Sequence, residues 1–500
     1  MSSNRYIPAW AASVADALGP GPHVVVTGIS PSGNIHVGNL REVLVAEAVV
    51  DALKAKGERV RFLFHADTAD PLRKIAPGVP REYKRYIGHS LSRVPDPEGC
   101  HASYAEHFLA PFEEALRRME IDIEVLRSHK LYESGFYAGV TREALEHTAE
   151  LREILQEVSG RQMPEDWSPY SPRAASGDLS STRVVEHLPE EHRVVFVDGD
   201  GREDTADYSK GVGKLLWRVE LAARWKALQA TFEPFGKDHT SRGGSTDTAD
   251  RMAKEVFRYP VPGRYEYEWI QIKGKGAMSS SKGIVLLPAA LLEIMPPEAL
   301  RRIVLGRDPA RALDLDLAEG FPRFMDGYRA ETEEKPVPFT HLVTVAQTVR
   351  GDVNAAADML CQGGYREAAA DHEKLVEYLT YARNWTEKWA PEALRFRILL
   401  LSEAAEAAKD LDEDQRRYLD IVAPQLENSM SGEKVQDILY STAGELSIKP
   451  KKAFSAVYTV LLGKKNGPKA GPFVAGLSAD VVQQRFCSVI RDTTTGGVEG

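Results

Sequence analysis

The chain opens with two short apolar runs that flank a helical pattern. Residues 23–27 form an apolar, β-branched run that ends in a Gly/Pro/Ser turn, and residues 59–64 form a second such run. Between them, apolar residues recur at helical spacing from about residue 37 to residue 56, and Gly57 marks the expected end. Strand, helix and strand in this order predict a βαβ unit of a parallel sheet.

The pattern changes between about residues 100 and 200, where the alternation of strands and helices is expected to break. Amphipathic helical spacing covers 105–119 and 141–158, a Pro/Ser-rich stretch follows at 163–181, and residues 194–201 have the pattern of a hairpin. We interpret this region as an inserted α/β connective domain between the two halves of a nucleotide-binding domain.

The alternation is expected to resume near residue 215. It continues through 232–236, a helix at 246–257 and a strand at 267–272, and from about residue 290 the pattern is helical almost throughout. A chain of 500 residues is too long for one core, so about two to four domains are expected. The predicted fold class is an α/β Rossmann-type domain with a parallel sheet and an insertion, followed by an all-α domain.

Composition and cysteine usage exclude several classes of protein. The hydrophobic fraction of 43% and the charged fraction of 27% are ordinary for a globular protein. No apolar run is long enough for a membrane span, and the start lacks the apolar core of a signal peptide, so we expect a cytoplasmic protein without a membrane partner. Cys100, Cys361 and Cys487 form no CxxC pair, which predicts buried free thiols, no disulfide framework and no thiolate zinc site.

The net charge of −10 argues against non-specific binding of nucleic acid. A local basic stripe is still compatible with a tRNA partner, and an ordinary solvated face explains the same residues equally well. The candidate stripe consists of Lys449, Lys451, Lys452, Lys464, Lys465 and Lys469.

The turn after the first predicted strand has the features of a phosphate-binding turn. It contains Gly28, Pro31, Ser32 and Gly33 and leads directly into the predicted helix. Backbone N–H groups and the positive end of the helix dipole converge at such a point and favour a phosphate.

Three residues at the start of that helix add candidate chemistry. His36 and Asn39 can donate to a phosphate oxygen whose negative charge grows as pyrophosphate leaves, and Gly38 leaves room for a purine to pack against the helix. The alternative is an ordinary βα turn with a surface histidine.

A second candidate segment, 276–283, follows the predicted strand at 267–272. Its serines supply hydroxyl donors in a mobile loop, and Lys282 supplies a positive charge for a triphosphate in the transition state. A lysine in such a loop is usually a surface residue, and the pairing with the upstream turn is what favours a function here.

A third candidate segment combines 235–239 with 242–245. Gly243 and Gly244 allow a close approach of the backbone to a ligand, Asp238 can accept from an amine or a ribose hydroxyl, and His239 can line a pocket. The alternative is a plain helix start with Ser245 or Thr246 as the N-cap.

Several short segments match one enzyme family. They are 28–33 with 36–39, 70–74, 217–219, 232–239 with 243–245, 278–283, 444–450, 462–464, 467–468 and 471–473. The first and the 278–283 segments resemble the HIGH and KMSKS ATP-binding signatures of class I aminoacyl-tRNA synthetases. The whole set is similar to the class I lysyl-tRNA synthetases and runs nearly from end to end.

This resemblance implies a lysine–tRNA ligase that activates L-lysine with ATP and Mg²⁺ and transfers it to tRNA(Lys). The oligomeric state stays open, with a monomer slightly favoured. The implied domains are 1–95, the first half of the Rossmann catalytic domain; 96–205, an inserted acceptor-end domain; 206–290, the second catalytic half; 291–345, a stem-contact region; and 346–500, a helical anticodon-binding domain.

The resemblance also assigns roles to residues. The implied catalytic residues are His36, Asn39 and Lys282. The implied ATP-binding residues are Pro31, Ser32, Gly33, Gly38, Asp238, Gly243, Gly244, Met278, Ser279, Ser280 and Ser281. The implied lysine-binding residues are Gly28, Ser30, Trp217, His239 and Tyr267.

Four departures from the family pattern leave alternatives open. Ala277 stands where the loop usually begins with lysine, and 171–177 lacks the Cys-Pro-x-Cys of several relatives, so neither a structural zinc nor another bound metal is expected. The segments 67–71 and 220–222 also differ. The alternatives are a specialised paralogue that activates lysine or a lysine analogue, and a non-catalytic homologue that binds tRNA or a nucleotide.

Overall fold

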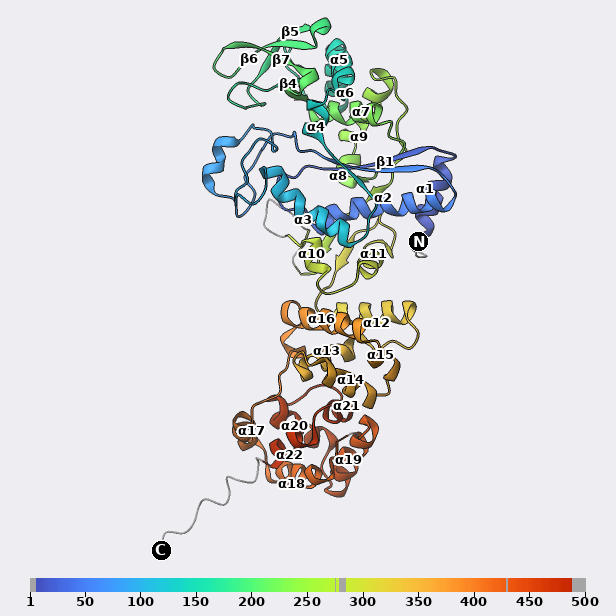
Figure 1. Ribbon diagram of the computed structural model, residues 1–500, viewed down its shortest axis with the longest axis vertical. Coiled ribbons are helices and arrows are strands. Elements are labelled where there is room, and N and C mark those ends of the chain that lie inside the picture. Colours follow the sequence, from blue (N-terminus) through green and yellow to red (C-terminus); the bar gives the residue numbers. More distant parts are fainter. Residues whose placement is uncertain (1–5, 275, 278–284, 429, 488–500) are drawn as a thin grey trace. The chain divides into compact units, whose positions relative to one another are not determined.

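The computed structural model describes residues 6–274, 276–277, 285–428 and 430–487 (Figure 1). The chain divides into two compact units. The first consists of Met1–Leu292 and Pro297–Leu315, and the second of Glu293–Pro296 and Asp316–Gly500.

A parallel sheet forms the centre of the first unit. Strands β1 (His23–Ile29), β2 (Val60–Ala66) and β3 (Glu124–Arg127) pair in parallel in the order β1-β2-β3. On the other edge of β1, Val26 N donates to Phe232 O at 2.9 Å, just before β9 (Phe235–Gly236), which pairs in parallel with β10 (Glu266–Tyr267). The strand order therefore reverses at β1, as in doubly wound nucleotide-binding sheets.

Helices cover both faces of this sheet (Figure 1). α2 (Val37–Ala55) and α3 (Tyr104–Arg118) lie on one side of β1, and α7 (Trp217–Leu228) and α9 (Ser245–Glu255) lie on the other. α2 is apolar on nearly every side and thirteen of its residues are buried, as expected for a helix inside a core. α1 (Ala9–Leu18) precedes β1.

The region between β3 and α7 holds a second layer of short elements. Strands β5, β6 and β7 form an antiparallel sheet, and β4 pairs antiparallel with β8. The elements are α4 (Ser128–Glu133), α5 (Ala138–Glu146), α6 (Thr148–Ser159), β4 (Tyr170–Pro172), β5 (Arg183–Leu188), β6 (Arg193–Val197), β7 (Glu203–Asp207) and β8 (Gly213–Leu215). The β6–β7 hairpin confirms the prediction for 194–201.

The structure corrects three sequence predictions in this unit. The alternation does not break near residue 100, because α3 and β3 continue the parallel sheet inside the range 96–205 that was expected to be an insertion. The helix expected over 141–158 is two helices that meet at His147. The strand expected over 267–272 is interrupted, because β10 ends at Tyr267 and β11 (Ile270–Ile272) joins another sheet.

The remaining elements of the first unit lie in and after the third candidate segment. β11 pairs in parallel with β13 (Leu313–Leu315) and antiparallel with β12 (Gly276–Ala277). Three short helices complete it: α8 (Lys237–Thr240), α10 (Pro288–Leu291) and α11 (Pro297–Leu305).

The second unit is helical wherever the structure describes regular elements from residue 320 onward, as the sequence predicts. Its first helices pack around Phe321, Phe339 and Trp385, and its last helices share a separate apolar core. They are α12 (Gly320–Thr332), α13 (Phe339–Val349), α14 (Val353–Gln362), α15 (Arg366–Ala370), α16 (His372–Lys388), α17 (Leu401–Ala407), α18 (Glu413–Val422), α19 (Gly432–Glu445), α20 (Pro450–Leu462), α21 (Ala470–Ala475) and α22 (Ala479–Cys487).

Among the described residues, no helix has both the length and the apolar character needed to cross a membrane. Cys100, Cys361 and Cys487 are free, as predicted, but they are exposed and not buried. Cys100 lies in a polar loop, and the other two lie in the last turns of the helices α14 and α22.

Candidate active site

A pocket of about 570 Å³ lies where the strand order of the parallel sheet reverses. Ligands of open parallel sheets bind outside the carboxyl ends of the strands at this point. The lining residues come from the turn after β1, from the segment after β2 and from the starts of α7 and α8. They are Ser30, Ser32, Gly33, Asp70, Pro71, Arg73, Lys74, Ile75, Ala76, Pro77, Trp217 and His239.

The turn after β1 and the start of α2 have the geometry of a phosphate site. His36 is the N-cap of the 19-residue helix α2, and the side-chain oxygen of Asn39 accepts from His36 N at 3.1 Å. This hydrogen bond uses the side-chain oxygen of Asn39, so the side-chain nitrogen of Asn39 can donate to a ligand. Pro31 and Gly33 are buried, whereas Ser32 is exposed, and Gly38 lies in the first turn of the helix.

His36 is held in the form that can donate a hydrogen bond without carrying charge. Burial lowers the pKa of His36 below its usual value, so the ring is neutral at pH 7. Its Nδ1 has no hydrogen-bond partner among the described residues. A neutral imidazole beside a helix N-terminus can donate to a ligand oxygen while the helix dipole attracts the ligand's negative charge.

The second candidate segment lies partly outside the described residues, namely Met278, Ser279, Ser280, Ser281 and Lys282. Its described flanks are nevertheless informative. Before this segment, β12 pairs with β11. After the segment, Leu286 O accepts from Val37 N at 2.9 Å. Because Val37 is the first residue of α2, the chain that leaves this segment returns to the phosphate-binding turn.

The two glycines of the third segment are required by the protein's own backbone. A Cβ on Gly244 would lie 2.5 Å from both His239 O and Ser241 O. Gly243 has a φ of +74°, and a Cβ there would lie 2.9 Å from Val158 O. The alternative interpretation, with Ser245 or Thr246 as the N-cap, is wrong in its cap residue, because α9 begins at Ser245 with Gly244 as its N-cap.

His239 of this segment lines the pocket. The rings of His239 and Trp217 lie 5.6 Å apart, and Ser245 Oγ is 3.2 Å from His239 Nδ1. Burial lowers the pKa of His239. Asp238 is exposed, and its Oδ1 accepts from Trp269 Nε1 at 2.7 Å.

The five residues expected to bind lysine fall into two groups. Ser30, Trp217 and His239 line the pocket. Gly28 and Tyr267 are not among its lining residues and are joined to each other by Glu42, whose carboxylate accepts from Gly28 N at 2.9 Å and from Tyr267 Oη at 2.7 Å. A Cβ on Gly28 would lie 2.8 Å from Arg224 Nη1, so this glycine makes room for a buried guanidinium.

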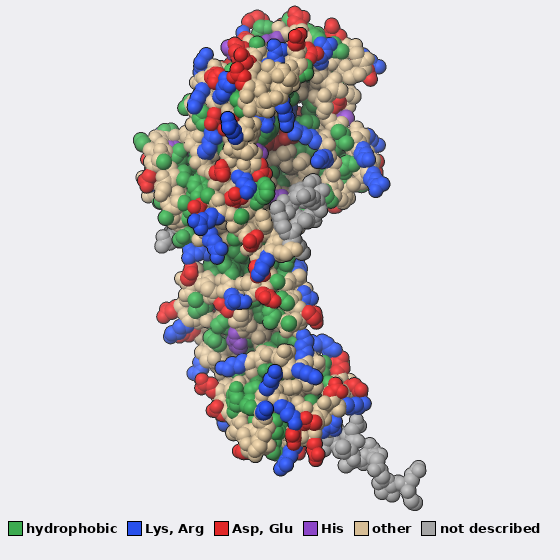
Figure 2. Space-filling view, turned by 180° about the vertical axis from the view of Figure 1, so that it is seen from behind, with side chains coloured by type: hydrophobic (Ala, Val, Ile, Leu, Met, Phe, Trp, Pro, Cys, Tyr) green, Lys and Arg blue, Asp and Glu red, His purple; other side chains and the backbone are tan. Residues whose placement is uncertain are grey.

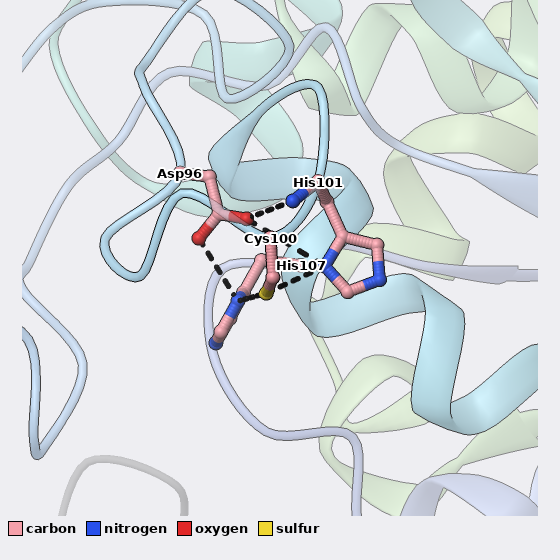
Figure 3. A group of neighbouring side chains, drawn as sticks. All are labelled: Asp96, Cys100, His101 and His107. Atoms are coloured by element: carbon pink, nitrogen blue, oxygen red, sulfur yellow. Dashed lines mark hydrogen bonds and ion pairs between the residues drawn. The ribbon is translucent and has the colours of Figure 1, made fainter.

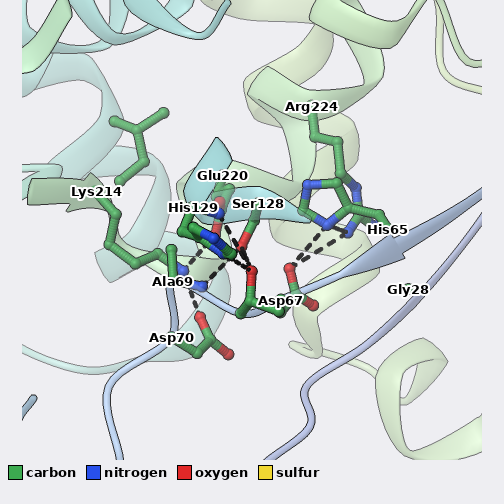
Figure 4. A network of polar contacts seen from close by, with 12 residues as sticks. Gly28, His65, Asp67, Ala69, Asp70, Ser128, His129, Lys214, Glu220 and Arg224 are labelled. Atoms are coloured by element: carbon green, nitrogen blue, oxygen red, sulfur yellow. Dashed lines mark hydrogen bonds and ion pairs between the residues drawn. The ribbon is translucent and has the colours of Figure 1, made fainter. Parts of the chain in front are cut away.

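A buried lysine lies beside the pocket (Figure 4). Lys214 Nζ forms ion pairs with Asp70, which lines the pocket, and with Glu220 at 2.6 Å. Burial alone would lower the pKa of Lys214, but the two carboxylates outweigh it and raise the pKa above its usual value. Glu220 also accepts from Tyr132 Oη at 2.9 Å.

The network continues to a buried arginine (Figure 4). Arg224 Nη2 donates to Glu233 at 2.5 Å, and its Nη1 lies 4.0 Å from Asp67, which is 2.9 Å from His65 Nδ1. Burial would raise the pKa of Asp67, but the charges of His65 and Arg224 outweigh it and hold the pKa at about 2. Lys214 and Arg224 thus face four carboxylates, two of which, on Glu220 and Glu233, have pKa values that burial raises.

The sequence prediction missed Glu42, Lys214 and Arg224. Glu42 and Arg224 each lie on a helix that is otherwise buried on nearly every side. A charged residue in such a helix must find a partner, because an unpaired buried charge is costly. Charged residues inside an otherwise apolar helical pattern were therefore the sequence signal for a buried polar network.

Fold and site together define a nucleotide-binding α/β domain of the class I aminoacyl-tRNA synthetase type. The family model for tRNA synthetases class I (K) matches residues 9–347, and the chain belongs to this family.

Curated relatives match over nearly the whole chain. A lysine–tRNA ligase of Archaeoglobus fulgidus is 39% identical over 480 residues, which cover 93% of this chain and 96% of the relative. A lysine–tRNA ligase of Methanosarcina barkeri is 35% identical, covering 95% and 97%. A lysine–tRNA ligase of Thermoplasma acidophilum is 34% identical, covering 97% and 99%.

Proposed function

We propose that the protein is a lysine–tRNA ligase that forms lysyl-adenylate from L-lysine and Mg²⁺–ATP and transfers the lysyl group to tRNA(Lys). The observation that carries the proposal is the match to lysine–tRNA ligases along nearly the full length of both chains. The position of the pocket at the reversal of the strand order supports it independently. Neither alternative from the sequence, a specialised paralogue or a non-catalytic homologue, is favoured by these matches.

In the first step, the lysine carboxylate attacks the α-phosphorus of ATP, and the bond to pyrophosphate breaks. No protein nucleophile is needed, so alignment and charge stabilisation carry the catalysis. The neutral ring of His36, the amide nitrogen of Asn39 and the N-terminus of α2 are the groups that donate to phosphate oxygens. Lys282 adds a positive charge for the triphosphate, as the family resemblance implies.

The pocket suits a cationic amino acid. The indole of Trp217 offers a face for the four-carbon stem of lysine or for its ammonium. Four carboxylates face Lys214 and Arg224 in the buried network, while Arg73 and Lys74 add positive charge to the lining itself, so recognition of an ammonium depends on individual acceptors and not on the net charge of the pocket. Asp70 and Ser30 are the lining residues whose oxygens can accept from the ammonium.

In the second step, the terminal adenosine 2′-hydroxyl of tRNA attacks the lysyl carbonyl, and AMP leaves. The helical unit contains a pocket of about 320 Å³ between α13 and the end of α20, which is large enough to receive an unstacked base. We assign residues 346–500 to anticodon binding and residues 291–345 to contact with the tRNA stem, as the family resemblance implies.

Two of the six lysines in the predicted basic stripe contact other groups of the protein. Lys452 pairs with Asp412 at 2.9 Å and Asp414 at 2.8 Å, and Lys464 Nζ donates to the backbone oxygen of Glu392 at 3.1 Å. The other four lysines are exposed: Lys449, Lys451, Lys465 and Lys469. On the face shown in Figure 2, Lys and Arg side chains are interspersed with Asp and Glu, so phosphate contacts on that face would come from local groups of basic residues.

The test is ATP–pyrophosphate exchange by the full chain with lysine, with and without tRNA, and with the other amino acids as controls. Exchange that depends on lysine supports the proposal. Exchange with a lysine analogue but not with lysine replaces it by the specialised paralogue. Failure of exchange with every amino acid, even with tRNA present, overturns it in favour of a binding protein.

A further inference from the structure

Two positive charges in the lining of the candidate pocket have no negative partner. Arg73 and Lys74 are consecutive, exposed residues that both line the pocket. Among the residues that the structure describes, neither forms an ion pair or a hydrogen bond through its side chain. By contrast, the buried cation beside the pocket, Lys214, pairs with Asp70 and Glu220. Two unpaired cations in a pocket wall attract an anionic ligand.

The backbone that carries these cations is anchored on both sides. On one side, Leu72 is fully buried, and its N donates to His89 O at 2.8 Å. On the other side, Ala76 is buried, and its N donates to Tyr104 Oη at 3.4 Å. The two cations therefore project from a fixed segment, which lowers the entropy that is lost when they bind a ligand.

The same tyrosine joins this segment to the phosphate-binding turn. Tyr104 Oη donates to Ser32 O at 3.1 Å, and Ser32 and Gly33 line the pocket. The turn leads into the N-terminus of α2, where backbone N–H groups and the helix dipole favour a negative charge. Two parts of one lining, the turn and the pair of Arg73 and Lys74, thus attract the same kind of group.

A polar cluster holds the start of α3, where Tyr104 is the first residue (Figure 3). The carboxylate of Asp96 accepts from the backbone N–H groups of Glu98, at 2.8 Å, and His101. Its Oδ1 also lies 3.0 Å from Nδ1 of His107, which belongs to α3. The tyrosine that links the two parts of the pocket lining therefore has a fixed support.

The sign of the charge changes along the lining of the pocket. Asp70 is only 8% exposed, whereas Arg73 and Lys74 are exposed. A carboxylate thus lies in the buried part of the lining, and the two cations lie where the lining meets solvent. This order fits a ligand whose ammonium group enters the pocket while a phosphate stays at its mouth.

We propose that Arg73 and Lys74 bind a nucleotide phosphate at the mouth of the pocket. The planar guanidinium can form two parallel hydrogen bonds to phosphate oxygens, and the ammonium adds a point charge. The inference rests on the proposed function, which offers two sources of this chemistry. One is the triphosphate of ATP, and the other is the 3′-terminal nucleotides of tRNA.

Steady-state aminoacylation by the full chain, with ATP and tRNA varied in turn, tests the proposal. The double variant Arg73→Gln/Lys74→Gln should raise the KM for the substrate whose phosphate is bound by about tenfold or more, because hydrogen bonds to charged groups typically contribute this much. A rise in the KM for ATP identifies the triphosphate, and a rise in the KM for tRNA identifies its 3′ end. Each single variant should show part of the same effect.

Arg81→Gln/Lys84→Gln is the matched control. It removes the same two charges from exposed positions of the short 3-10 helix Arg81–Tyr86, outside the pocket lining. Its KM values should equal those of the wild type. The proposal is overturned if both KM values stay unchanged in the Arg73→Gln/Lys74→Gln variant, or if the control raises them equally.

Equilibrium binding separates this inference from the proposed function. A wild-type chain that activates no amino acid would overturn the ligase, yet its affinities for ATP and for tRNA can still be compared with those of the variants. If the source is tRNA, Arg73→Gln/Lys74→Gln should also reduce the slope of log Kd against log salt concentration by about one to two. Affinities for ATP and tRNA that equal those of the control variant would overturn the phosphate site.

Discussion

Glu42 offers a direct test of the polar contacts behind the pocket. Its carboxylate accepts from Gly28 N and Tyr267 Oη, and burial is the main reason why its pKa rises from 4.5 to about 7. Glu42→Gln keeps the shape and removes the charge. The amide oxygen can still accept from Gly28 N, and the amide nitrogen can donate to the hydroxyl oxygen of Tyr267.

The size and sign of the effect follow from this pKa. Because the pKa is raised on folding, the contribution of Glu42 to stability is present in full below pH 4.5 and is lost as the pH rises through about 7. At about 1.4 kcal/mol per pH unit, the ionised carboxylate costs the folded protein about 3 kcal/mol above pH 8. Glu42→Gln should therefore match the wild type near pH 5 and exceed its free energy of unfolding by up to about 3 kcal/mol at pH 8.5.

Urea unfolding of the full chain at pH 5 and pH 8.5, followed by tryptophan fluorescence, measures this difference. Glu47→Gln on the same helix is the matched control. Glu47 binds Arg301 through two contacts of 2.9 Å, so losing its charge should lower stability at both pH values. Equal destabilisation of Glu42→Gln at both pH values would refute the reasoning, because it would mean that the carboxylate is needed in its charged form.

Three further tests, the first with a matched control variant, address other parts of the structure. Gly244→Ala places a Cβ 2.5 Å from two backbone oxygens and should cost at least about 1–3 kcal/mol in urea unfolding, whereas Gly327→Ala, in the interior of α12 with no atom within 4 Å, should gain about 0.5–1 kcal/mol. Lys214→Met leaves two buried carboxylates without their cation and should cost about 3–5 kcal/mol; an unchanged unfolding midpoint would contradict the network. Lys282→Ala should lower the rate of pyrophosphate exchange by about 10²–10³ with an unchanged circular dichroism spectrum.

The sheet could be predicted from the sequence only where its strands are apolar. β1 and β2 are largely buried, and their apolar runs predicted both strands and the parallel connection between them. β3, with the sequence Glu-Val-Leu-Arg, is not fully buried at any position. β3 joins the sheet through backbone hydrogen bonds to β2, and these need no apolar side chain. Because its sequence has no apolar run, the alternation of strands and helices looked broken at this point.

Helix boundaries failed where local backbone geometry overrides periodicity. The apolar spacing of 141–158 continues through His147, but this residue ends α5 and begins α6 with a φ of −109° and a ψ of 30°. At α9, the hydroxyl groups of Ser245 and Thr246 donate to His239 O, so they hold the preceding loop and do not cap the helix. Spacing alone carries no information about such contacts.

The candidate site could be predicted in its local parts and not in its distant ones. The turn after β1 and the start of α2 lie within a dozen residues, so their chemistry is visible in one stretch of sequence. Glu42 meets Tyr267 across 225 positions, and Lys214 meets Asp70 across 144. Only the topology of the sheet brings these pairs together.

The buried charges are better explained by positioning than by stability. Removing an ion pair from water costs about as much as the pair returns, so a well-packed apolar replacement is often at least as stable. Here Lys214 fixes Asp70, which lines the pocket, and Glu42 fixes Gly28 and Tyr267, which do not line it. A site that stabilises developing charge requires groups that are already oriented before the reaction. The cost of burying these charges is therefore a consequence of holding Asp70 in the pocket wall, and the ends of β1 and β10, in place.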